Sequence, residues 1–130
     1  KTKAKARRIE KKTVLIIRDG EKVAIGKRED KGLLAGLYEL PNVEGHLDAD
    51  EVVQYCKDIG LMPVRIKKLS LAKHIFSHVE WHMTGYLVKV DELEKANRKD
   101  FLFIHPEEIE AAYPIPSAFE NYMQMLRISF

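Results

Sequence analysis

Two long segments of β-forming residues, separated by only three residues, most restrict what this chain can fold into. Residues 64–75 and 79–90 are rich in β-branched and aromatic side chains, and the break between them is Phe76-Ser77-His78. Such side chains are typical of strands, and so short a break joins neighbouring strands of one sheet. The sequence therefore predicts a long hairpin or an adjacent strand pair.

Polar and apolar side chains alternate in the second of these strands. We expect Trp81 and Met83 to face the core. The other face would present His78, Glu80 and His82, whose side chains are common zinc ligands. However, alternate strand residues lie roughly 6.5 to 7 Å apart at Cα, so three ligands would have to converge over an extended segment. We therefore predict a polar sheet face and no metal site.

The beginning of the fold also has β character. Residues 14–17 and 23–25 are apolar runs, and the Asp19-Gly20 sequence between them is typical of tight turns. We therefore expect the fold to open with two strands in a hairpin.

A helix is predicted over residues 48–59, because apolar residues recur there at helical spacing. Asp48 or Asp50 can cap its first turn, and Gly60 is placed to end it. Cys56 lies on the apolar side of this helix, so we expect its side chain to pack in the core.

The C-terminal third contains shorter elements. We predict a polar surface loop over 91–100, a short strand over 101–104 and a helix over 106–112 with a proline in its first turn. Ser117 and Glu120 have the spacing of a capping box, which predicts a closing helix with Ser117 as its N-cap.

The composition limits the chain to one domain. With 130 residues, 45% of them apolar, it can bury one core but has no room for a second. Because Cys56 is the only cysteine, the chain alone forms no disulfide and holds no iron–sulfur cluster, which suits a reducing, intracellular setting. No apolar run approaches the roughly 18 residues of a membrane span, so a soluble protein is expected.

The net charge of +2 comes from 22 Lys and Arg against 20 Asp and Glu, so total charge does not indicate a nucleic-acid ligand. Residues 1–12 differ, because Glu10 is the only acid among many cations. The cations are Lys1, Lys3, Lys5, Arg7, Arg8, Lys11 and Lys12. Such a block predicts a solvated linker or arm, and contact with phosphates is the alternative.

The segment Gly36-Leu37-Tyr38-Glu39-Leu40-Pro41, followed by a helix ending in Gly60-Leu61, resembles the signature region of Nudix proteins. The resemblance implies an α+β, Nudix-like fold with a mixed β-sheet packed between helices. In active Nudix hydrolases that helix holds an Arg-Glu pair and a Glu-Glu pair, whose carboxylates bind the magnesium that activates water. The matching positions here are Val53, Gln54, Tyr55, Cys56, Lys57 and Asp58. We therefore expect no catalytic residues and no Nudix hydrolysis.

The chain also resembles the C-terminal domain of MutY-type adenine DNA glycosylases. Three blocks carry this resemblance, residues 31–41, 74–81 and 113–117, and together with the Nudix-like order of elements it spans almost the whole chain. In that family, the domain recognises 8-oxoguanine opposite adenine. An N-terminal catalytic domain of the same polypeptide, which contains an iron–sulfur cluster, then excises the adenine.

The resemblance implies a role in DNA base-excision repair, with residues 1–12 as a basic linker and residues 13–130 as the lesion-recognition domain. The implied partners are double-stranded DNA with an 8-oxoguanine:adenine mispair and the catalytic domain of the same polypeptide. The domain by itself is expected to be a monomer without cofactor or enzyme activity. Its expected location is the bacterial cytoplasm, at the nucleoid.

The family's Phe-Ser-His loop corresponds to Phe76, Ser77 and His78. The resemblance implies that Ser77 contacts the oxidised base, that Phe76 gives an apolar or wedging contact and that His78 bonds to phosphate or braces the loop. One departure is Tyr38, where many relatives have tryptophan. Both side chains are flat and amphipathic, so the departure leaves the resemblance intact.

Three cations at the start of the first block, Lys27, Arg28 and Lys31, are further candidates for phosphate contacts, against a default of solvated surface. Two other functions are left open by the sequence. One is a catalytically inactive Nudix-like module that binds a protein or a nucleotide. The other is a working Nudix pyrophosphohydrolase, against which Gln54 and Lys57 argue.

Overall fold

The computed structural model describes residues 6–91 and 101–130. Its strands form one sheet with the order β3-β2-β1-β6-β5, while β4 pairs with β1 and β7 pairs with β2. The strands are β1 (Arg8–Asp19), β2 (Lys22–Lys27), β3 (Tyr38–Glu39), β4 (Asn42–Glu44), β5 (Met62–Ile75), β6 (Val79–Asp91) and β7 (Leu102–Ile104). The helices are α1 (Ala49–Asp58), α2 (Pro106–Ala112), the 3₁₀ turn η2 (Ser117–Phe119) and α3 (Glu120–Met123).

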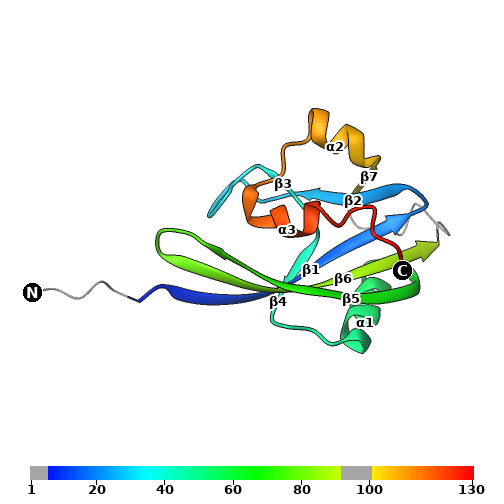
Figure 1. The fold of residues 1–130 in the computed structure, drawn as a ribbon, viewed down its shortest axis with the longest axis horizontal. Coiled ribbons are helices and arrows are strands. Elements are labelled where there is room, and N and C mark those ends of the chain that lie inside the picture. The colour runs from blue at the N-terminus through cyan, green and yellow to red at the C-terminus, as the bar shows by residue number, and fades with distance from the viewer. Residues whose placement is uncertain (1–5, 92–100) are drawn as a thin grey trace, which may run out of the picture.

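The sheet is mixed and lies between helices, as the sequence predicts. Strands β1 and β6 are parallel, whereas the other pairs are antiparallel. Helix α1 lies on one side of the sheet, and α2, η2 and α3 lie on the other (Figure 1). Each side has its own apolar core, one around Val52 and Cys56 of α1 and one around Trp81, Phe119 and Tyr122.

The long hairpin is confirmed, and it is the largest feature of the sheet. Strands β5 and β6 pair from Met62↔Asp91 to Ile75↔Glu80, with register shifts between Pro63 and Arg65 and between Leu69 and Ala72. The predicted opening hairpin and the strand at 102–104 are also present. Strand β4 was not predicted, and most of the predicted 91–100 loop lies outside the described residues.

The start of β1 corrects the predicted boundary between linker and domain. Arg8 already pairs with Val79, so residues 8–12 belong to the sheet. Their charges suggested a solvated arm, but the backbone of β6 supplies hydrogen-bond partners that a sequence pattern does not reveal. Lys12 is 7% exposed, and its Nζ lies 4.9 Å from the centre of a Trp81 ring, an arrangement typical of cation–π contacts.

Helix α1 begins as predicted, and Asp48 rather than Asp50 caps it. The Asp48 carboxylate accepts a hydrogen bond from Glu51 N at 2.9 Å, and the Glu51 carboxylate accepts one from Asp48 N at 3.0 Å. This reciprocal pair satisfies two amide groups at the helix start. Cys56 is fully buried, as predicted, and burial raises the pKa of its thiol to about 11.

The prediction of an N-cap at Ser117 was wrong. The last helical segment begins with a 3₁₀ turn in which Phe119 N donates to Pro116 O, so Pro116 occupies the cap position and Ser117 lies inside the turn. Ala118, Phe119 and Tyr122 are all buried. The segment thus begins one residue earlier than predicted. We attribute this to the packing of these three side chains, which fixes the faces of the segment that turn toward the core. In the described part of the chain, no helix is long and apolar enough to span a membrane.

Candidate nucleic-acid interface

The three residues between β5 and β6 form a tight loop at one end of the molecule. Phe76 N donates to Val79 O at 2.8 Å and closes the loop. Ser77 and His78 are exposed at its tip, whereas Phe76 is half-buried. Together with the first residues of β1, the loop extends past the helices (Figure 1). It therefore presents two polar side chains on an ordered support.

Phe76 points inward and anchors this loop. Its ring centroid lies 5.0 Å from that of Trp81 and 4.7 Å from that of His74, in edge-to-face arrangements that are favourable for aromatic pairs. Trp81 is 1% exposed, as predicted, and also packs against Phe119. Of the predicted loop residues, Ser77 and His78 are thus the two whose side chains face solvent.

The beginning of β1 holds the loop from a second direction. Arg7 Nε donates to Phe76 O at 3.1 Å, and Arg8 N donates to His78 O at 3.1 Å. Arg7 Nη1 also lies 3.6 Å from Glu80 Oε2. These contacts join residues about 70 positions apart, so no local pattern pointed to Arg7. It was predicted only as part of the basic block.

Replacing Arg7 with alanine should loosen the loop in the free protein. The lost hydrogen bond is worth about 1 kcal/mol, so the amide protons of residues 76–78 should exchange roughly 5-fold faster, as measured by NMR. Arg8→Ala is the matched control, because the Arg8 side chain bonds to Glu10 and its contact with the loop is through the backbone. Equal exchange rates in the Arg7 variant and wild type would contradict the contact.

A second loop, residues 28–37, lies beside this end of the sheet, and Arg28 braces it. Arg28 Nε donates to Leu33 O at 3.1 Å and Nη1 bonds to the Glu39 carboxylate. Its guanidinium lies 5.4 Å from the centre of a Trp81 ring. Arg28 was predicted as a phosphate contact, but here its donors bond within the chain. Lys27 and Lys31, the other two candidates, are exposed.

The three sequence blocks that resemble glycosylase domains meet in this region. Tyr38, from the first block, packs edge-on against Tyr113, from the third, with ring centroids 5.0 Å apart. The second block contains Phe76 and Trp81, and Trp81 belongs to the apolar core against which Tyr38, Phe76 and Tyr113 all pack. Segments far apart in the sequence therefore build a single end of the molecule.

Two of the three carboxylates of α1, those of Glu51 and Asp58, are engaged in local hydrogen bonds. Gln54 Nε2 donates to Asp58 Oδ1 at 2.8 Å, and the Glu51 carboxylate belongs to the helix cap. Lys57 is exposed on the same helix. Residues 6–91 and 101–130 contain no group of three His, Cys, Asp or Glu side chains that could hold a metal ion.

The polar face of β6 is arranged as predicted. His82 Nε2 and Glu80 Oε1 are 3.1 Å apart. The pKa of Glu80 is lowered, first by this hydrogen bond and then by the nearby charges of Lys73, His82 and Arg7. Glu80 is therefore a carboxylate whose charge is already balanced by its neighbours.

The sequence matches the NUDIX domain family over residues 13–125, and the chain belongs to this family. Among solved structures, it is similar to the C-terminal domain of mouse MUTYH in complex with human PCNA, with a TM-score of 0.69 and 22% identity over 89% of this chain and 86% of that chain. It is also similar to the MutT NUDIX hydrolase from Burkholderia pseudomallei, with a TM-score of 0.66 and 13% identity over 95% and 100% of the two chains. A third similar structure is the MutT protein from Methanosarcina mazei, with a TM-score of 0.65 and 12% identity over 95% of this chain and 96% of that chain. These similarities confirm the predicted Nudix-like fold.

Proposed function

We propose that this domain recognises 8-oxoguanine opposite adenine in DNA, as part of a MutY-type adenine glycosylase. The observation that carries the proposal is the exposed Ser77 at the tip of a loop held by Phe76, Arg7 and Arg8. The similarity to the mouse MUTYH domain supports a repair role. In this proposal, excision belongs to a catalytic domain of the same polypeptide, where the iron–sulfur cluster would also lie.

The chemistry of the lesion suits a serine hydroxyl. Oxidation at C8 converts N7 of guanine from a hydrogen-bond acceptor into an N–H donor, which changes the pattern that this base edge presents. A hydroxyl can accept from N7–H while it donates to the neighbouring O6. Because Ser77 lies on a braced loop, less conformational entropy is lost when it binds. His78 is exposed beside it, and in this proposal it contacts a phosphate.

The magnitude of this contact limits its share of the selection. A good bidentate contact to a base discriminates by about 1 to 3 kcal/mol, or roughly 5-fold to 150-fold. A genome offers about 10⁶ or more competing sites. Ser77 is therefore one part of recognition, and easier extrusion of the mispaired adenine into the catalytic domain supplies another part.

The test compares binding of two duplexes that differ only in 8-oxoguanine or guanine opposite adenine, titrated with the chain. Replacing Ser77 with alanine should reduce the preference for the lesion roughly 5-fold or more. Ser70→Ala is the matched control, because Ser70 is an exposed serine on β5 away from the loop. An unchanged preference in the Ser77 variant would contradict its role. The absence of any preference in the wild-type chain would contradict the proposed function.

A second candidate, binding of a protein without hydrolysis, is favoured by the complex of the mouse MUTYH domain with human PCNA. It predicts saturable binding of PCNA by this chain and no effect of Ser77→Ala on that binding. Magnesium-dependent release of phosphate or pyrophosphate from nucleotides would instead support a hydrolase. The Gln54–Asp58 hydrogen bond and the exposed Lys57 argue against that activity.

A further inference from the structure

Strand register brings three basic side chains into one row across the sheet. Lys11 of β1 pairs with His82 of β6, and His82 pairs with Lys73 of β5. Directly opposed residues place their side chains on the same face. Neighbouring strands lie about 4.7 to 4.9 Å apart, so the Cα atoms of the two lysines are about 10 Å apart with His82 between them.

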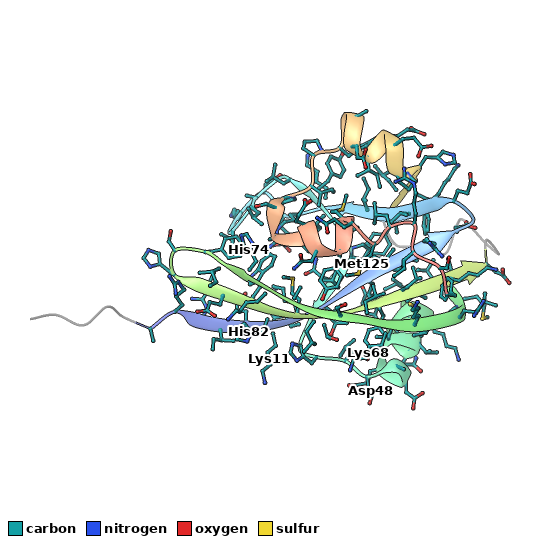
Figure 2. The ribbon with its side chains drawn as sticks, in the orientation of Figure 1. Lys11, Asp48, Lys68, His74, His82 and Met125 are labelled. Carbon is teal, nitrogen blue, oxygen red and sulfur yellow. The ribbon has the colours of Figure 1, made fainter. Side chains whose placement is uncertain are left out.

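This row lies on a part of the sheet that the helices leave uncovered. Trp81 and Met83 face the C-terminal helices, so His82 points to the opposite side. Figure 2 shows Lys11 and His82 on that side, beyond the end of α1. Lys11 and Lys73 are exposed, and 34% of the His82 side chain is exposed. All three are therefore accessible to a ligand.

The two lysines of the row have no carboxylate in direct contact, although Glu80 lies near Lys73 and bonds to His82. Glu80 lies on the same face, but it is already engaged by Arg7 at 3.6 Å and His82 at 3.1 Å. In the described part of the chain, neither Lys11 nor Lys73 forms a salt bridge. An anionic ligand would supply the counter-charge that these two lysines lack.

Protection of a sheet edge accounts for only part of the row. Lysines commonly blunt edge strands, and Lys73 lies on the edge strand β5. Lys11 does not, because β6 flanks it on one side and Gly45 N donates to its carbonyl oxygen on the other. Edge protection therefore does not explain why a second lysine, Lys11, lies opposite His82.

We propose that the Lys11–His82–Lys73 row binds the phosphodiester backbone of DNA beside the β5–β6 loop, an inference that rests on the proposed function. The row is continuous with that loop, because Arg7 on the same face donates to Phe76 O. Four strand residues separate His78 from His82, or about 13 Å at about 3.3 Å per residue. At 3.4 Å per phosphate of one strand, this distance is about four base steps. A single duplex can thus contact both the loop and the row.

The experiment measures how the affinity of the chain for an unmodified duplex depends on salt between about 50 mM and 200 mM. Each lost phosphate contact should lower the slope of log K against log salt by about 0.9, so Lys11→Ala/Lys73→Ala should lower it by about 2. Lys22→Ala/Lys89→Ala is the charge-matched control, because Lys22 lies at the turn between β1 and β2 and Lys89 is exposed near the far end of β6. An unchanged slope in the double variant would overturn the proposal, as would a wild-type chain without salt-dependent binding.

A second arm separates this inference from its alternatives. In this measurement poly-L-glutamate replaces the duplex as the probe. If Lys11 and Lys73 are needed for binding of this polymer but not for binding of DNA, the row binds an acidic protein and the proposal is overturned. Ser77→Ala should leave the salt slope on unmodified DNA unchanged. If lesion preference is absent while the double lysine variant still lowers the slope, the proposed function fails and the phosphate row stands.

Discussion

Replacing Trp81 with alanine is expected to lower the free energy of unfolding by about 3 to 5 kcal/mol, the range for deletion of large aromatic side chains from cores. Trp81 is 1% exposed and packs against Phe76 and Phe119. Lys12 and Arg28 lie over its rings. The variant would therefore lose core packing and the anchor of the β5–β6 loop together. Urea denaturation monitored by circular dichroism measures the change.

Two further variants make this result interpretable. Met83→Leu is a volume-conserving change on the same face of β6 and should cost less than about 1.5 kcal/mol. Trp81→Phe should cost less than the alanine variant, because the buried Trp81 Nε1 has no hydrogen-bond partner among the described residues. A loss for Trp81→Ala no larger than that for Met83→Leu would contradict the central position of the indole.

Replacing Gly85 with alanine should destabilise the fold by about 1 to 3 kcal/mol or more, through overpacking. A β-carbon at Gly85 would overlap Cε1 of Tyr122. The Tyr122 ring is held in place, because its hydroxyl donates to Ser70 O at 2.8 Å and the ring is fully buried. Denaturant unfolding again measures the effect.

A double-mutant cycle tests the cause of that loss. Tyr122→Leu removes the atoms that the new methyl group would meet, so Gly85→Ala should cost less in the Tyr122→Leu background than in wild type. Equal costs in the two backgrounds would show that the penalty comes from the strand backbone rather than from the tyrosine.

Local sequence signals predicted the elements correctly where one pattern was enough to define them. The Asp48–Glu51 capping box belongs to a helix whose periodicity is plain, and its partners are three residues apart. Ser117 and Glu120 have the same spacing, yet no cap forms there because Phe119 and Tyr122 pack in the core and the turn begins at Pro116. Where packing and a local pattern disagree, burial of large apolar side chains contributes more free energy than one cap.

In the candidate site, too, some features follow from local sequence patterns and others depend on packing. Ser77 was identified from a three-residue motif, and its exposure at a hairpin tip follows from the two long strands around it. The inward turn of Phe76 was not predicted, because it depends on the position of Trp81 across the hairpin. Nor was the role of Arg28, whose partners Leu33 and Glu39 are close in sequence but meet only in the folded loop.

By itself, the sequence determined the paired strands, the capped helix α1 and the exposed loop, because each depends on side-chain periodicity or turn chemistry within a few residues. Only the tertiary structure decided that Arg7 holds the loop and that Lys11 lies opposite His82. Both depend on the parallel register of β1 against β6, which joins segments about 70 residues apart. That register is set by summed packing over the whole sheet, in which a shift of one residue would exchange the core and solvent faces of β1.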